Sequence, residues 1–206
     1  MTSDWAVEKG LDLLGEGRKQ EKRARYLTVV PDPLDEAEPT ARKALSTLRS
    51  AMNWLEFTDH FEAAHAALDD TGRFTRETFG CHLTWREDQY WQECPVALAH
   101  NRVGMSPAMV IGRAECSICR SDPEDCEHIT GRTYDGEMCV RVIAEVRQIL
   151  EVSMVGRPAQ PDARLMAVSL GVKQFRERFG AGFVPGAHVN CDRCLYPCDG
   201  VSRPFE

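Results

Sequence analysis

The sequence has no long hydrophobic run and none of the short motifs that mark the commonest enzyme classes. A membrane-spanning helix needs about 18 or more consecutive apolar residues, so we expect none here. The motif H-E-x-x-H, glycine-rich phosphate loops, dinucleotide fingerprints and the G-x-S-x-G nucleophile motif are all absent. The first residues also lack the basic and then apolar segments of a secretory signal. We therefore expect a soluble, cytoplasmic protein.

A net positive charge is also lacking. The 206 residues carry a formal net charge of −7, whereas sequence-independent nucleic-acid binding needs a positive field. Basic side chains gather in residues 18–25, where Glu16 and Glu21 dilute the charge. The simpler interpretation of this tract is a solvated helix face. A nucleic-acid-binding protein that uses this tract, or the arginines of residues 141–178, is an alternative hypothesis.

Composition and periodicity predict an α+β protein. The 43% hydrophobic and 28% charged residues are typical of a globular chain with one domain or two small ones. Apolar residues at steps of three and four predict a helical region over residues 1–75. Short β-branched and aromatic segments predict a β-rich, barrel-like domain over residues 80–166, on which the helices pack. Residues 167–206 are predicted to form a helix followed by a cysteine cluster.

Several boundaries within these regions follow from local signals. We expect one helix from residue 4 to about residue 25, and a second helical stretch that opens at Pro39-Thr40 and ends at residues 69–72. This second stretch is either one long helix or two helices separated near Asp59. Residues 82–91 are predicted to hold two strands around a polar turn. Residues 139–155 fit both a helical stripe and a strand alternation, but their seven β-branched residues favour strands.

Cysteine occurs nine times and is most concentrated in the thirteen residues 116–128. Cys116 and Cys119 have the C-x2-C spacing at which both thiolates reach one metal ion, and Cys126 and His128 follow. In a reducing compartment such cysteines are metal ligands or buried thiols rather than disulfides. We predict a zinc knuckle formed by these four residues. Cys139 is an alternative fourth ligand, and buried free cysteines beside a surface histidine are the simpler interpretation.

A second cluster lies near the C-terminus. His188, Cys191, Cys194 and Cys198 follow the spacing H-x2-C-x2-C-x3-C, which predicts a second zinc site. The number of ions and the fourth ligands stay open. Other residues that can complete these sites are Cys81, Cys94, His82 and His100. Iron is an alternative to zinc, but the presence of imidazole beside thiolate favours zinc.

The knuckle itself favours a structural role. A closed Cys3His site has no open coordination position for a substrate or water. Between Glu115 and Cys139 the sequence has seven acidic and two basic residues, which would repel phosphates. The leading hypothesis is therefore a soluble zinc-binding structural or interaction protein whose partner is another protein. The sequence favours a protein without catalytic activity over an enzyme but leaves the question open.

One segment resembles a known family. Residues 150–165, Leu-Glu-Val-Ser-Met-Val-Gly-Arg-Pro-Ala-Gln-Pro-Asp-Ala-Arg-Leu, resemble the EVSLV…PANP.A signature of tailed-phage prohead maturation proteases. In that family a serine motif of the S-I-G-[FY] kind lies upstream, and its serine is the nucleophile of a β-barrel protease. The resemblance extends over about residues 100–166. It implies a β-rich domain into which the zinc knuckle is inserted.

The same resemblance places Ser106 at the nucleophile position. Pro107 and Ala108 stand where the family has Ile and Gly. The family's histidine lies tens of residues before the serine, a distance that suits His60 or His65. A serine endopeptidase with Ser106 as nucleophile is thus the other alternative hypothesis. The simpler interpretation of Ser106 is the first residue of a Ser-Pro turn.

Overall fold

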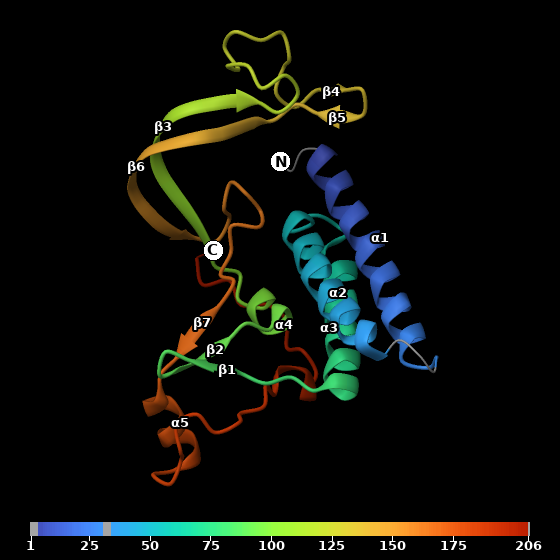
Figure 1. The fold of residues 1–206 in the computed structure, drawn as a ribbon, viewed down its shortest axis with the longest axis vertical. Helices are drawn as coiled ribbons and strands as arrows, with labels where there is room; N and C mark the ends of the chain where they lie inside the picture. The colour runs from blue at the N-terminus through green and yellow to red at the C-terminus, as the bar shows by residue number, and fades with distance from the viewer. Residues whose placement is uncertain (1–3, 31–33, 206) are drawn as a thin grey trace. The chain divides into compact units, whose positions relative to one another are not determined.

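The computed structural model describes residues 4–30 and 34–205. Its backbone separates into two compact units (Figure 1): one comprises Met1–Gly104 with Gly156–Glu206, and the other is Met105–Val155. The sequence predicted three consecutive regions instead. The larger unit contains the helices, which confirms the α+β class, and the smaller one contains a long β-ribbon. No helix among the described residues is both long and apolar enough to cross a membrane.

Three helices form the main core. Helix α1 (Asp4–Leu27) and helix α3 (Phe61–Phe79) both pack on α2 (Leu34–Trp54). The core side chains of α2 and of the residue that follows it recur at helical spacing and are completely or almost completely buried: Leu45, Leu48, Met52 and Leu55. Gly10 and Gly17 allow α1 to approach α2 closely. A Cβ on Gly10 would lie 2.6 Å from the side chain of Leu55, and a Cβ on Gly17 would lie 2.6 Å from that of Leu48.

Two predicted helix boundaries are wrong. Helix α2 begins at Leu34 and includes Pro39, because a proline near the start of a helix removes only one backbone hydrogen bond. Ala37, which lies before the proline, is already fully buried. Helix α3 continues through residues 69–72 to Phe79. Gly72 does not end it but allows Val96 to approach, 2.7 Å from the position of a Cβ.

The small sheet of the larger unit has strand order β1-β2-β7. Strands β1 (Thr84–Arg86) and β2 (Gln89–Gln92) form the predicted hairpin, and both turn residues, Glu87 and Asp88, have positive φ. Strand β7 (Val168–Leu170) pairs with β2. Helix α5 (Val172–Phe179) packs Phe175 on the buried Tyr90, with ring centroids 4.4 Å apart. The remaining helical segments are α4 (Pro95–Ala99) and the 3-10 turn η1 (Arg193–Leu195).

The smaller unit contains a two-stranded ribbon of β3 (Gly104–Cys116) and β6 (Arg141–Val155), and the loop region that connects the two strands lies at one end of the ribbon (Figure 1). Of the segment 139–155, residues 141–155 are thus strand and not helix, as the β-branched residues predicted. That loop region holds the short hairpin of β4 (Thr133–Tyr134) and β5 (Glu137–Met138). The predicted barrel is wrong, because the sheets of the described residues have three, two and two strands and none of them closes.

Candidate metal centres

The knuckle group, comprising Cys116, Cys119, Cys126 and His128, lies at the end of the β-ribbon. Strand β3 ends at Cys116, and the chain then turns sharply. The amide of Arg120 donates to the carbonyl of Cys116 at 2.9 Å, and the amide of Cys116 donates to the carbonyl of Ser121 at 2.8 Å. This tight turn directs the side chains of Cys116 and Cys119 to the same side.

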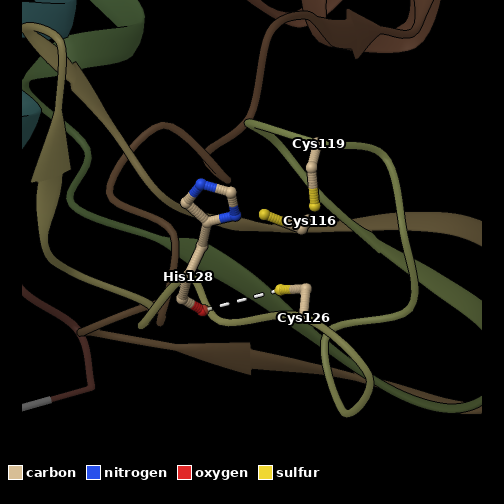
Figure 2. Close-up of side chains that lie close together, drawn as sticks. All are labelled: Cys116, Cys119, Cys126 and His128. Atoms are coloured by element: carbon tan, nitrogen blue, oxygen red, sulfur yellow. Dashed lines mark hydrogen bonds between the residues drawn. The ribbon is translucent and has the colours of Figure 1, made fainter.

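The four side chains of the knuckle group converge as the sequence predicted. Each offers one ligand atom, and these atoms all lie within 4.8 Å of one another. Figure 2 shows the histidine ring beside the cysteine sulfur atoms, with the Cys126 thiol 3.7 Å from the carbonyl oxygen of His128. Cys116 is buried, whereas Cys119 is exposed. A metal ion bound by these atoms would therefore lie near the surface.

Backbone amides adjust the chemistry of the knuckle thiols. The amides of Cys119 and Ile118 donate to Cys116 and lower the pKa of its thiol to about 7, against the effect of burial. The amide and hydroxyl of Ser121 likewise lower the pKa of Cys119. Because the thiolate is the form that binds metal, these hydrogen bonds favour the ligating state. Burial acts in the opposite direction on Cys126 and raises its pKa.

His128 has one ring nitrogen without a hydrogen-bond partner. Its Nδ1 atom is buried and has no hydrogen-bond partner. The ring packs edge-on against Tyr134, with centroids 4.6 Å apart, and the Tyr134 hydroxyl accepts a hydrogen bond from the amide of Ile129 at 2.8 Å. An unpartnered buried imidazole nitrogen is costly unless something binds it. The residues present thus fit a metal ion.

Cys139, the alternative fourth ligand, lies close to the same site. Its sulfur is 3.7 Å from that of Cys116. Burial, together with the neighbouring Cys116 thiol, raises the pKa of Cys139 to about 11. It does not belong to the set whose ligand atoms all lie within 4.8 Å of one another. The geometry therefore favours His128 over Cys139, as a Cys3His set.

The C-terminal cluster is arranged differently from the sequence prediction. Its four ligand atoms do not come together as one group in the described part of the chain. His188 contacts Asn190 at 3.0 Å and the ring of His82. Cys191 lies beside Cys94: their hydrogen bond lowers the pKa of Cys191 to about 6 and, with burial, raises that of Cys94.

Cys194 and Cys198 both border a small cavity beside Asp69, but of the two only Cys198 joins a set of converging ligand atoms. Cys194 lies against α3, where its sulfur is 3.0 Å from the position of a Cβ on Gly72. Cys198 joins His65, Asp69 and His100 in a second set of ligand atoms within 4.8 Å of one another. Sequence reasoning missed this group because its members come from separate segments. The one local signal was the spacing of His65 and Asp69, which places both on one face of a helix.

The residues of the two alternative hypotheses are less distinctive. Ser106 is half-buried on β3, and the only histidine of its unit, His128, belongs to the knuckle group. In the basic tract, Arg23 and Arg25 pair with glutamates at 3.3 and 2.8 Å. These contacts favour neither a serine nucleophile nor a phosphate-binding surface.

Comparison with known proteins adds no relative. No family model matches the chain, and neither a curated protein nor a solved structure shows significant similarity to it. The resemblance to prohead proteases therefore stays a prediction. Function has to be inferred from the geometry of the sites.

Proposed function

We propose that this chain is a zinc-stabilised interaction protein in which the knuckle group binds one structural Zn²⁺ and the adjoining β-ribbon binds another protein. The observation that carries the proposal is the convergence of three thiols and one imidazole at the end of the ribbon. Thiolate and imidazole are the ligands that zinc prefers in structural sites. Such a site leaves no position for a substrate.

Zinc explains how a long, thin ribbon keeps its shape. A two-stranded sheet is marginally stable in water on its own. Cys116 ends β3, and the amide of Ser117 donates to the carbonyl of Val140 at 3.0 Å, just before β6 begins. A metal ion held by Cys116 and by residues of the intervening loop would fix the turn between the strands. It would thereby restrain the register of the pair.

The ribbon offers a surface for the partner. Alternation along β6 places four large apolar side chains on one face, and all are exposed: Val146, Leu150, Val152 and Met154. Gly112 of β3 lies instead against Glu145 and Arg147, on the opposite face. Contiguous exposed apolar surface in a folded protein marks an interaction site. The loop of residues 115–139 is acidic, and complementary charges meet in protein interfaces. The proposed partner therefore presents basic side chains beside apolar ones.

Metal analysis of the purified protein tests the zinc site. Cys116→Ser is expected to lose one equivalent of zinc relative to the wild type, because one of the four ligands is removed. Cys139→Ser is the matched control, since Cys139 lies 3.7 Å from Cys116 but outside the four-ligand set. Equal zinc in the wild type and the Cys116→Ser variant would refute the proposed site. Loss of zinc from Cys139→Ser would instead make Cys139 a ligand.

The interaction surface is tested by affinity capture with matched variants. Leu150→Lys introduces a charge into the apolar face, whereas Glu145→Gln changes the opposite face. We expect the wild type and Glu145→Gln to retain the same partner protein, and Leu150→Lys to lose it. If Leu150→Lys retains the same proteins, this face is not the binding surface. Self-association that Leu150→Lys abolishes would identify a second copy of the chain as the partner.

A further inference from the structure

A second group of ligand atoms lies in the larger unit, far along the chain from the knuckle. His65 and Asp69 are one turn apart on α3, His100 follows α4, and Cys198 follows η1. The site is largely shielded from water: the side chains of His65, Asp69 and His100 are 12%, 15% and 7% exposed. We call these residues the α3 group.

Three partners converge on a single nitrogen of this group. The Nε2 atom of His65 lies 3.0 Å from Nε2 of His100, 3.5 Å from Oδ2 of Asp69 and 3.4 Å from Sγ of Cys198. One imidazole nitrogen carries either one proton or one lone pair, so it can make one good hydrogen bond. Hydrogen bonding within the group thus leaves at least two of the three contacts unsatisfied.

The hydrogen bond of His100 to the backbone determines which of its ring nitrogens carries the proton. Its Nδ1 atom lies 2.6 Å from the carbonyl oxygen of Val96, which can only accept, so Nδ1 carries the proton. In a neutral imidazole the Nε2 atom is then an unprotonated lone pair directed at His65 and, at 3.3 Å, at Oδ1 of Asp69. A proton on Nε2 of His65 would serve only one of the acceptors around it, whereas a metal cation at the centre would serve the His100 nitrogen, the carboxylate and the sulfur together.

The spacing of the atoms matches zinc coordination. A tetrahedral zinc ion with nitrogen and oxygen at about 2.0–2.2 Å and sulfur at about 2.3 Å separates its ligand atoms by about 3.3–3.6 Å. In the α3 group, Nε2 of His65 lies 3.0 Å from Nε2 of His100, 3.4 Å from Sγ of Cys198 and 3.5 Å from Oδ2 of Asp69. The other carboxylate oxygen, Oδ1, lies 3.3 Å from Nε2 of His100. A cation placed among these atoms therefore needs little rearrangement of the side chains.

Outer contacts orient the ligands as in metal sites. The hydrogen bond of His100 to Val96 presents Nε2 to the centre, and Glu62 lies 3.6 Å from Nδ1 of His65. The amide of Gly200 and Nη2 of Arg193 both donate to the sulfur of Cys198, each at 3.2 Å. Ligating histidines commonly pair their other nitrogen with a carbonyl or carboxylate. Donors to sulfur favour the thiolate.

We propose that His65, Asp69, His100 and Cys198 bind a Zn²⁺ ion that fastens the C-terminal segment to α3 and to the end of α4. Four protein ligands fill a tetrahedral site, so this zinc is structural. One carboxylate, two imidazoles and one thiolate are all accepted zinc ligands.

The geometry separates this site from a Cys-His-Asp nucleophile. In such a triad the histidine contacts the nucleophile through one ring nitrogen and the carboxylate through the other. Here Cys198 and Asp69 both approach the same nitrogen of His65, Nε2. The carboxylate beside the other ring nitrogen, Nδ1, belongs to Glu62, an exposed residue 3.6 Å away, which is too far for a hydrogen bond. Asp69 therefore does not orient the ring for Cys198, whereas convergence on one point is what a metal ion requires.

Zinc content of single variants tests the proposal. We expect at least two equivalents of zinc in the wild type, and one equivalent less in His100→Gln and in Cys198→Ser, each checked for folding by circular dichroism. Cys194→Ser and His60→Gln are the controls and keep the full content. Zinc lost from Cys194→Ser but kept by a folded His100→Gln would overturn the α3 group and restore the C-terminal cluster as the site.

Binding of Co²⁺ by Cys116→Ser supplies a test that needs neither His100→Gln nor Cys198→Ser to fold. Cys116→Ser alters only the knuckle, so it keeps the α3 group and is loaded with Co²⁺ after removal of zinc. The expected spectrum is that of a tetrahedral ion with one thiolate ligand, and its charge-transfer band is absent from Cys116→Ser/Cys198→Ser. A Cys116→Ser variant that binds no Co²⁺ would overturn the inference while leaving the knuckle proposal untouched.

Discussion

Glu56 holds the completely buried Arg102 through both carboxylate oxygens, which accept from Nε at 2.9 Å and from Nη2 at 2.7 Å. Arg164 donates to the same carboxylate, and the third guanidinium nitrogen of Arg102 donates to Asn53 at 3.0 Å. One carboxylate near the end of α2 therefore joins the segment after α4 and the segment before β7. This network ties the end of α2 to the segments that lead into β3 and β7.

Removal of that carboxylate should destabilise the protein strongly. Glu56→Ala leaves two buried guanidinium groups without their counter-charge, and breaking a buried ion pair in this way costs about 3–5 kcal/mol. Urea unfolding followed by circular dichroism measures the change in the free energy of unfolding. Glu77→Ala, which removes an exposed glutamate of α3, is expected to change it by less than about 0.5 kcal/mol. Similar values for the two variants would contradict the role given to Glu56.

The glycines of α1 should respond oppositely to alanine. A Cβ on Gly17 would lie 2.6 Å from the side chain of Leu48, so Gly17→Ala should force the helices apart and cost about 1–3 kcal/mol. Gly15, two residues away, has no neighbour within 4 Å of the corresponding position. There alanine gains only its better helix propensity, about 1 kcal/mol of stabilisation. Thermal unfolding of both variants should show Tm shifts of opposite sign.

The knuckle could be predicted from the sequence because its ligands are local. All four lie within residues 116–128, so the C-x2-C spacing and a short loop already limit their positions. The α3 group could not be predicted in this way. His65 and Cys198 are 133 residues apart, and their approach depends on how α3, α4 and the C-terminal segment pack. Cysteine spacing alone therefore assigned Cys198 to the wrong neighbours in this fold.

Secondary structure shows the same division between local and distant causes. The β-branched residues of residues 139–155 and the turn at residues 87–88 determined strand and hairpin directly. The start of α2 did not follow from Pro39, because Ala37 and Ala41 on either side of the proline are fully buried and this packing cannot be read from the local sequence. Arg102 was not recognised as a core residue, since its burial depends on Glu56, 46 residues earlier in the chain.

Loss of the knuckle zinc should loosen one region and spare another. In Cys116→Ser we expect faster amide hydrogen exchange over residues 117–140, because a bound ion would restrain this loop. Residues 45–54 of α2, which contribute side chains to the helical core, should exchange as in the wild type. Hydrogen exchange followed by mass spectrometry resolves both regions. Unchanged exchange in the loop would show that the turn is held without zinc.

The outer contacts of the α3 group give a graded prediction that rests on the proposed second zinc site. Arg193 donates from Nη2 to the sulfur of Cys198 at 3.2 Å, and loss of an outer partner of a ligand costs about 10–100-fold in metal affinity. Arg193→Ala should therefore keep the zinc ion but release it to a competing chelator at a concentration at least about tenfold lower.

Arg178→Ala is the matched control for this measurement, because Arg178 forms an exposed ion pair with Asp192 at 2.9 Å and contacts no ligand of the group. Each variant is made in the Cys116→Ser background, where the knuckle no longer contributes zinc to the titration. Equal release from both variants would mean that Arg193 does not support the thiolate. Since both substitutions remove one positive charge from the same region of the chain, a general electrostatic effect would weaken binding equally, and only a specific contact separates them.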